Sequence, residues 1–504
     1  MRRGRVRKTS SPQQESLNAP AFINRAIPFF ALLQEEGLSQ IEAQADWLIQ
    51  EKGMDFTANP YALELWRKAG AKIEGERVRA DAAMIRELIK TAPASFTQHS
   101  RNPDRSVQIG GNHQVFAPVY GPPFVRDLDQ GRRYGTIKDL ENLVKICYNL
   151  PSLHHSGLVT CEPCDVPVSK RHLDMVYLHM RYSDKPHLGA ITTKERAEDS
   201  IEMARILHTK AVMDQHCVIM GNVNTNSPLL IDRVVTEAIE VYCGAGQGII
   251  VAPFILGGAM GPVTTAGSIA QALAEAMFCC AYSQIIRKGA PFVLGNFLSS
   301  MNLRTGAPTF GMPEPVLSNL IIGQLARRLN LPLRCGGSLT ASKIADFQAG
   351  AESADSMLST ALAGANFVLH AAGWLEGGLC TSFEKLILDA DRLGAHQTIM
   401  HGLALNENTL AQSAYGEVDP GGHFLGSAHT MQNYETAYYE ASMSDSENVE
   451  NWEERGSQSA EMRANLKMKQ ILGDYQPPSL AMDKKEALEA YIARRKSELP
   501  DQWY

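Results

Sequence analysis

Between about residue 155 and residue 405, short apolar runs alternate with longer amphipathic segments. Strands alternating with helices predict βαβ units and a parallel sheet. Eight such units that close on themselves form a TIM barrel. We therefore predict an α/β fold with a TIM (β/α)8 barrel, while one misassigned run would leave an open doubly wound sheet as the alternative. The runs are residues 157–161, 187–192, 217–222, 248–256, 291–297, 331–336, 366–370 and 397–402.

The chain before this alternation has a different pattern. Its first ~115 residues are predicted to be mostly helical. Ser39 and Glu42 have the spacing of a capping box, and a helix between Asn59 and Gly70 begins with a proline after its cap. Residues 95–130 are predicted to be short β segments with turns.

The chain after residue 405 contains a glycine-rich stretch at 421–430 and a last predicted helix over 483–497. These patterns divide the chain into four parts. We predict a disordered basic tail over 1–20, a helical N-terminal extension with a short β segment over 21–150, the barrel over 151–405, and a C-terminal loop and helical tail packing on the barrel over 406–504.

Composition and charge narrow the possible functions. A net charge of −7 argues against a nucleic-acid partner, which would favour a basic surface. Nine cysteines in no regular framework favour a reducing cytoplasm, and the lone CxxC of Cys161 and Cys164 offers too few ligands for structural zinc. Residues 241–274 carry no charge, but their glycines and prolines favour a buried strand, loop and helix over a membrane span.

Polar residues at the ends of the predicted strands are the first candidates for chemistry. Asn222 and Asn224 follow the third run, Arg334 lies in the sixth, and His370 ends the seventh. An isolated histidine or arginine is more often structural than catalytic. Barrels, however, gather polar groups from different strands at one mouth, so these residues become candidates together.

Longer motifs, in order over residues 120–430, resemble the trimethylamine methyltransferase family. They are YGPPFVRD (120–127), LGGAMGPVT (256–264), RTGAPTFGMPE (304–314), ASKIADFQAG (341–350), HAAGWLEGG (370–378), SFEK (382–385) and GGHFLGSAHT (421–430). The resemblance implies a TIM barrel that passes a methyl group to the cobalt of a corrinoid (cobalamin) carried by a separate protein. No cofactor or metal is then expected in this chain, and we also expect a homo-oligomer.

One departure from the family changes the expected substrate. The trimethylamine enzymes carry pyrrolysine near the segment that matches residues 335–353, and this chain has ordinary amino acids there. It is thus similar to the non-pyrrolysine branch, whose members act on betaines such as glycine betaine. A quaternary ammonium leaves as a neutral amine without a proton, so it needs no amine-activating residue. A small betaine-type quaternary amine is therefore the predicted substrate.

Three alternatives stay open. The chain could demethylate a tertiary methylamine, or it could bind a quaternary amine without turning it over. A barrel lyase would need a metal or a Schiff-base lysine at the strand ends, and Lys343 is the lysine near one of the matched motifs.

The predicted substrate divides the candidate residues by charge. Aromatic faces or acids suit an ammonium group, and a bidentate arginine or an imidazole suits a carboxylate. Ordinary packing is an equally good explanation for the aromatic residues. We assign Tyr120, Phe310, Trp374 and Glu376 to the ammonium, Arg334 and His370 to the carboxylate, and Asn222 or Asn224 as a neutral donor.

Glycine-rich loops are the candidates for contact with the corrinoid. Gly257, Gly258, Gly377 and Gly378 lie in two of the matched motifs and would allow close approach. The alternative role of these glycines is packing of helices on the barrel. His423 and His429 lack an identifiable third metal ligand, so we expect His423 and His429 to anchor a loop by hydrogen bonds.

Overall fold

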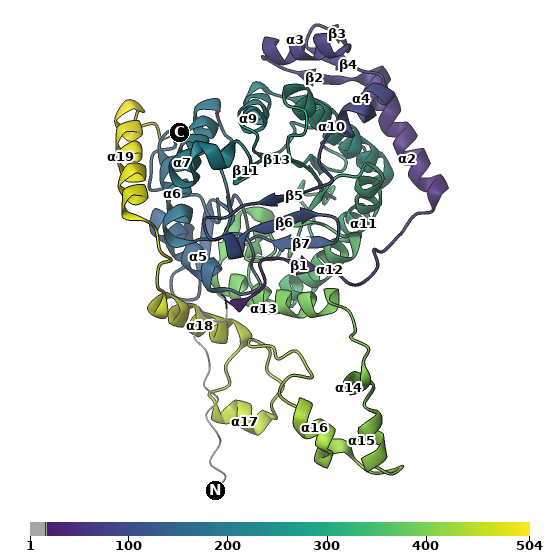
Figure 1. Cartoon of the computed structure of the whole chain (residues 1–504), viewed down its shortest axis with the longest axis vertical. Coiled ribbons are helices and arrows are strands. Elements are labelled where there is room, and N and C mark those ends of the chain that lie inside the picture. Colours follow the sequence, from purple (N-terminus) through teal and green to yellow (C-terminus); the bar gives the residue numbers. More distant parts are fainter. Residues whose placement is uncertain (1–15, 17, 504) are drawn as a thin grey trace.

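The computed structural model describes residue 16 and residues 18–503, so most of the predicted basic tail lies outside the described residues. Its centre is a curled ten-stranded sheet in a mixed α/β fold, with helices around the outside (Figure 1). Seven neighbouring strands run parallel. In sheet order they are β10 (His187–Leu188), β11 (Ile219–Val223), β13 (Gly248–Val251), β15 (Phe292–Gly295), β17 (Leu333–Gly336), β18 (Phe367–Leu369) and β7 (His113–Phe116).

The strands and their helices alternate along the chain as the pattern predicts. Every residue of β13, β15 and β17 is buried, as expected for a parallel sheet covered on both faces. The helices are α5 (Ile137–Asn149), α6 (Arg171–Tyr182), α7 (Lys194–His208), α8 (Lys210–Met213), α9 (Arg233–Gly244), α10 (Thr265–Ile286), α11 (Pro313–Arg328), α12 (Phe347–Ala363) and α13 (Phe383–Met400).

Six of the eight predicted runs coincide with a parallel strand of this sheet. The prediction of a strand in the last run is wrong. Residues 397–402 form the end of α13 and the turn after it. One turn of an amphipathic helix can give the same short apolar run as a strand, so the pattern alone cannot separate the two. The place beside β18 is taken by β7, which comes from the stretch predicted as N-terminal extension.

The first predicted run, 157–161, contains no assigned strand, but the residues before it lie between β7 and β10. His154 N–H donates to Phe116 O of β7 at 3.0 Å. On the other side, Ser156 N–H donates to Pro186 O at 2.9 Å, and Gly157 O accepts a hydrogen bond from β10 at 2.9 Å. Backbone hydrogen bonds through residues 154–157 thus connect the first and last strands of the parallel series.

The N-terminal region combines helices with small strands. The helix capped by Asn59 and ended by Gly70 is confirmed as α3 (Pro60–Ala69), and α4 (Ala82–Ile89) follows Asp81. The predicted capping box at Ser39 is wrong, because α2 (Glu35–Trp47) begins one turn earlier. The helix continues as a π-helix over Leu48–Lys52. The strands are β1 (Ile23–Asn24), β2 (Met54–Phe56), β3 (Lys72–Glu74), β4 (Arg77–Arg79), β5 (Ser95–Gln98), β6 (Val107–Gly110) and, pairing with β2, β12 (Leu230–Ile231).

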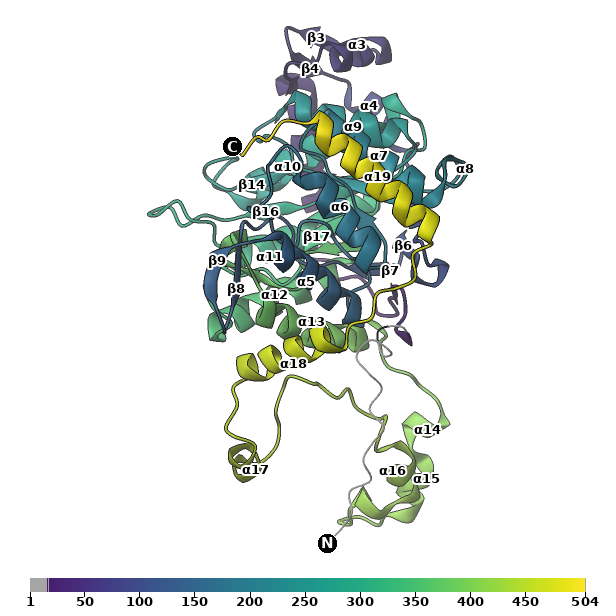
Figure 2. The ribbon, with the colours of Figure 1, turned by 90° about the vertical axis from the view of Figure 1, so that its left-hand side faces the viewer.

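The carboxyl ends of the parallel strands, called the mouth below, carry two further sheets. One pairs β14 (Phe254–Leu256) with β16 (Phe297–Ser299), and the other joins β8 (Phe124–Asp127), β9 (Gly131–Tyr134), β19 (Trp374–Leu375) and β20 (Cys380–Ser382). In Figure 2 the strands β14, β16, β8 and β9 lie on the left-hand side of the molecule, and β6 lies on the right-hand side.

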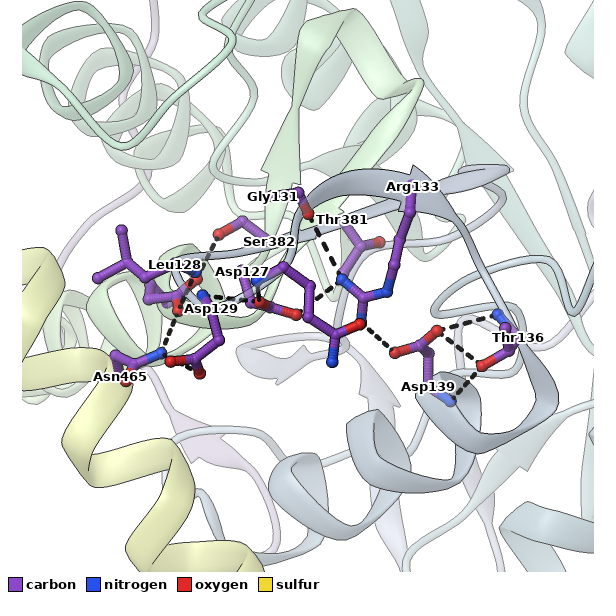
Figure 3. Close-up of polar contacts among 12 residues, drawn as sticks. Asp127, Leu128, Asp129, Gly131, Arg133, Thr136, Asp139, Thr381, Ser382 and Asn465 are labelled. Atoms are coloured by element: carbon purple, nitrogen blue, oxygen red, sulfur yellow. Dashed lines mark hydrogen bonds and ion pairs between the residues drawn. The ribbon is translucent and has the colours of Figure 1, made fainter.

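The β8–β9 hairpin at the mouth is fixed to the body by charge (Figure 3). Arg133 donates to Asp127 at 2.7 Å within the hairpin and to Asp139 of α5 at 2.6 Å. Asp139 in turn caps α5 together with Thr136. The rim of the mouth is therefore held in place by an ion-pair network in addition to the apolar contacts of Phe124 and Val125.

The long uncharged stretch is confirmed as a buried strand, a loop and a helix. It forms β13, β14, the following loop and the start of α10. Among the described residues, α10 is the one helix long and apolar enough to cross a membrane, but 89% of its apolar segment is buried inside the fold, as in a core helix. All nine cysteines are free thiols.

The C-terminal region contains two long helices and one excursion. α18 (Ala460–Asp474) packs on α13, and α19 (Met482–Glu498), which confirms the last predicted helix, packs on α7. Residues 401–438, called the arm below, stand away from the body in both views (Figures 1 and 2). The arm contains α14 (Glu407–Leu410), α15 (Gln412–Glu417) and α16 (Ala428–Asn433), and α17 (Val449–Glu454) follows it.

Candidate functional site

Arg334 in β17 is a buried cation without a counter-ion. The residue is 1% exposed, and its Nη1 donates to Asn296 O at 3.1 Å while Nε has no partner. Burial lowers the pKa of Arg334 to about 10, and no carboxylate among the described residues acts on it. Because an unpaired buried charge is costly, this position is suited to receive an anion.

His370 lies at the end of the neighbouring strand and supplies a neutral donor. Its Nδ1 accepts a hydrogen bond from Tyr120 N–H at 3.1 Å, so the neutral ring carries its proton on Nε2. Burial, and then the charge of Arg334, hold the pKa of His370 well below its usual value. The ring is therefore neutral at physiological pH, and its Nε2–H can donate beside Arg334.

Aromatic rings gather around these two residues, with Phe297 at the centre. The Phe297 ring lies 4.9 Å from Arg334 Cζ and stacks on His370 at 5.3 Å between ring centroids. It also stacks on Phe310 at 5.7 Å, and Trp374 meets both Phe310 and His370 edge to face at 5.2 and 4.5 Å. The result is an aromatic cluster directly beside a buried cation and a neutral donor.

The position of Trp374 is fixed from behind. Its Nε1–H donates to Thr340 O at 3.1 Å, in the loop that follows β17. The Thr340 hydroxyl and Ala341 N–H both donate to the buried Glu352 of α12, at 2.6 and 2.8 Å. A hydrogen-bonded loop thus holds the indole ring before any ligand arrives.

The other residues predicted to bind the substrate are not members of this aromatic cluster. Some of them already use their polar groups in contacts within the protein. Asn222 is buried with its Oδ1 unpartnered, and it faces the side of β11 opposite Gly221, which packs on α9. Asn224 is exposed. Tyr120 contributes its backbone amide, and its ring belongs to none of the cluster's ring pairs. Glu376 is already paired with Arg132 at 2.9 Å.

The predicted corrinoid-facing glycines have different surroundings. A Cβ at Gly378 would come within 2.5 Å of the Trp374 ring, so this glycine allows the turn to pack on the indole. Gly377 borders Phe310. Gly257 and Gly258 lie at the mouth, where Leu303 and Val263 surround the Cα of Gly258.

Phe297 and its neighbour Phe254 were not among the site residues predicted from the sequence. Their rings lie 5.1 Å apart, and the two residues are partners in the β14–β16 pair. Each follows a parallel strand of the sheet by two or three residues, Phe254 after β13 and Phe297 after β15. An aromatic residue just beyond the end of a strand was therefore the feature of the sequence from which these two residues could have been predicted.

The lyase alternative gains no support from the described residues. Among them, no group of three or more His, Cys, Asp or Glu side chains is placed to hold a metal ion. Lys343 is exposed, and its Nζ donates to Ala341 O at 2.9 Å. The buried Lys385 is ion-paired with Asp389 at 2.7 Å. His429, as expected, anchors its loop through Asn408 O at 2.8 Å.

Known proteins of similar sequence cover nearly the whole chain. A glycine betaine methyltransferase from Desulfitobacterium hafniense (strain Y51) is 36% identical over 481 residues, which are 95% of this chain and 100% of that protein. A proline betaine:corrinoid methyltransferase from Eubacterium limosum is 26% identical, covering 68% of this chain and 72% of its own length. A trimethylamine methyltransferase from D. hafniense (strain DSM 10664 / DCB-2) is 25% identical, covering 83% and 85%.

A solved structure of the Methanosarcina barkeri monomethylamine methyltransferase aligns with 94% of this chain and 95% of its own length, at 12% identity and a TM-score of 0.46. The model of the family described as trimethylamine methyltransferase matches residues 1–500. The chain belongs to the trimethylamine methyltransferase family.

Proposed function

We propose that this protein transfers a methyl group from a betaine-type quaternary amine, with glycine betaine as the first choice, to the cobalt(I) of a separate corrinoid protein. The observation that carries the proposal is the unpaired guanidinium of Arg334 beside an aromatic cluster. A betaine has one carboxylate and one quaternary ammonium a few bonds apart. The two parts of the site match these two charges.

Arg334 is the proposed carboxylate anchor. The planar guanidinium can offer two parallel N–H donors to a carboxylate, which a lysine cannot copy. The Nε2–H of His370 would add a third donor without adding charge, and Asn222 is the proposed further polar contact. Binding of the carboxylate then removes the cost of the buried unpaired cation.

The rings of Phe297, Phe310 and Trp374 are the proposed surface for the ammonium. Aromatic faces attract quaternary cations through the ring quadrupole, and they do so without solvating the cation as water does. The partner's corrinoid supplies the nucleophile. When a methyl carbon is attacked, the C–N bonding pair stays on nitrogen and a neutral tertiary amine leaves, so no residue of this chain must supply a proton.

Apolar side chains around the mouth are the proposed docking surface for the corrinoid protein. Val263 and Leu303 flank the predicted loop at Gly258. The loop after β17 and the β19–β20 turn add Ile344, Phe347 and Leu379, and all five side chains are exposed, Phe347 to 90%. A partner that must bring its cofactor to the mouth would cover this ring and exclude water from the site.

We also propose that the curled sheet is a closed eight-stranded barrel, with residues 154–157 as its second strand. The hydrogen bonds of these residues to β7 and to β10 support this closure. The chain's mouth is then a single opening, consistent with one site that is reached from one end.

The proposal can be tested with a corrinoid protein reduced to cobalt(I) and a panel of amines. We expect the cobalt(I) absorption band to disappear when glycine betaine and this protein are added together, and not with either alone. Trimethylamine should give no loss of the band. If no betaine gives methyl transfer although calorimetry detects betaine binding, the chain is a binding protein and the proposed reaction is wrong.

A further inference from the structure

A second cavity, separate from the aromatic cluster, lies between α12 and α13 and has a volume of about 200 Å³. None of the residues predicted to bind the substrate lines it. Most of its wall is apolar, with Ala349, Ala354 and Met357 from α12 and Leu388 from α13. Sites for drug-sized molecules measure roughly 300–1,000 Å³, so this cavity suits a smaller ligand.

The charged pair in the wall of the cavity is already satisfied. Lys385 Nζ donates to both carboxylate oxygens of Asp389 at 2.7 Å and to Ser353 Oγ at 2.9 Å. Asp389 also accepts a hydrogen bond from Gly373 N–H at 2.9 Å. The two charges neutralise each other, so this pair does not need a ligand.

The second acid in the wall, Asp346, is satisfied as well. Its carboxylate caps α12 by accepting a hydrogen bond from Ala349 N–H at 3.0 Å. It also accepts from the Ser342 hydroxyl at 2.8 Å. Both acids that line the cavity are therefore committed to contacts within the protein, and neither is left to attract a cation.

Two side chains of α13 in the wall lack such contacts. His396 is 6% exposed, and its Nδ1 has no hydrogen-bond partner among the described residues. Arg392 is exposed and forms no hydrogen bond or ion pair with a side chain in the described part of the chain. Positions i and i+4 lie on one face of a helix, so the guanidinium and the imidazole are neighbours at the cavity.

The His396 ring is neutral at physiological pH. Burial, and then the charge of Arg392, lower the pKa of His396 to about 4. A neutral imidazole carries one N–H, and no described residue fixes which nitrogen of His396 holds it. The ring can therefore place its proton on the nitrogen that faces a ligand.

We propose that this cavity binds a small aliphatic carboxylate. Arg392 supplies paired N–H donors for the two carboxylate oxygens, and His396 adds a donor without adding charge. The apolar wall takes up the short alkyl chain, whose burial is favourable. Phosphate and sulfate have no apolar part, and an alkylammonium would bring a second positive charge to Arg392. This inference is independent of the proposed methyl transfer, because it uses neither the aromatic cluster nor a corrinoid.

The test is calorimetry of the full chain with butyrate, 1-butanol and butylamine, which share an alkyl chain and differ in charge. We expect saturable binding of butyrate that is at least about tenfold tighter than binding of the other two, as for a hydrogen-bonded charge. No butyrate binding, or equal affinities for butyrate and 1-butanol, overturns the proposal.

The proposed substrate anchor Arg334 could also attract a carboxylate, so each titration is repeated with Arg334→Ala. Butyrate binding should be unchanged in this variant. Butyrate binding that disappears in Arg334→Ala overturns the carboxylate site between α12 and α13 and leaves the proposed methyl transfer standing. A crystal soaked in butyrate should show the ligand between α12 and α13, and a ligand bound elsewhere contradicts the proposal.

Variants of the cavity wall test the two parts of the site separately. Arg392→Gln should weaken butyrate binding about tenfold, because one charged hydrogen-bond donor is removed. Ala354→Leu fills the cavity and should abolish butyrate binding. The matched control is Ala351→Leu, the same change on an exposed position of α12 outside the cavity, which should have no effect. Circular dichroism checks that each variant is folded, and an unchanged butyrate affinity in folded Arg392→Gln or Ala354→Leu overturns the proposal.

Discussion

The mouth and the arm are both rich in apolar side chains, but they present them in opposite ways. At the mouth, Phe297, Phe310 and Trp374 pack on each other, and Trp374 is held by Thr340 before a ligand binds. In the arm, the rings and leucines face outward, and polar side chains hold the backbone. The aromatic side chains of the mouth are therefore ordered by contacts with each other, whereas the apolar side chains of the arm are exposed.

This contrast separates two kinds of ordering. A site for a small cation must exist before binding, because a small ligand has little binding energy with which to order side chains. Side chains on a protein-binding surface can become ordered on binding, because the contact area between two proteins is large.

The body should lose stability in acid through its buried histidines. His154, His179 and His187 are fully buried, and burial lowers their pKa values to about 3, about 3 and about 4. Unfolded histidine titrates near 6.5, so below that pH the unfolded chain binds protons that the folded chain does not. Their contribution is fully present above about pH 6.5 and is lost as the pH falls, at up to about 1.4 kcal/mol per pH unit for each histidine.

Urea unfolding at several pH values from neutral to mildly acidic measures this slope. His154→Asn is a useful comparison, because an amide oxygen can replace Nδ1 as the acceptor for Phe116 N–H. The variant should show a shallower loss of stability in acid than the wild type. A urea midpoint of unfolding that is the same at neutral pH and at pH 5 would contradict the prediction.

Replacement of Arg334 should have the largest effect on binding. Arg334→Ala should weaken glycine betaine binding by about 2–4 kcal/mol, the range for removing one partner of a desolvated charge pair. Choline and tetramethylammonium have no carboxylate and should lose far less. Calorimetry with both ligand types measures the difference. Equal losses for both types would show that Arg334 supports the fold and not the ligand.

Phe297 should matter for every quaternary amine, with or without a carboxylate. Phe297→Leu keeps an apolar side chain but removes the ring that lies at the centre of the cluster. We expect a loss of about 0.5–2 kcal/mol in binding, the range for one cation–π contact. The same loss for betaine and for tetramethylammonium is the expected pattern. A loss limited to betaine would mean that Phe297 acts only by positioning Arg334.

How far the sequence predicted the structure depended on how local each feature is. The helix from Asn59 to Gly70 follows from its own cap, proline and glycine, and it was predicted correctly. The strand β7 falls within the predicted short β segments, but its place in the central sheet was not predicted, because its partner β18 lies about 250 residues away. Residues 397–402 were misassigned because a single helical turn and a short strand share one apolar pattern.

The site shows the same limit. The convergence of strand ends predicted that Arg334 and His370 would lie together, and the structure places them around one ring, Phe297. Phe297 itself was not predicted, because an aromatic residue carries no mark that separates packing from binding. The side chain of Glu376 was assigned to the ammonium from charge alone, since its pairing with Arg132 depends on β9, far away in sequence. The binding roles of all these residues stay predictions.

The smallest expected effect concerns Glu376, which decides how far the binding surface extends from the aromatic cluster to the rim. Its carboxylate is paired with Arg132, whose side chain is 39% exposed, and such a pair contributes about 0–1 kcal/mol. Glu376→Gln should therefore leave betaine and choline affinities nearly unchanged and lower stability slightly. Arg132→Gln is the matched control, because it breaks the same pair from the other side. If Glu376→Gln alone weakened both ligands tenfold, the carboxylate would contact the ammonium, and the binding surface would include the rim as well as the rings.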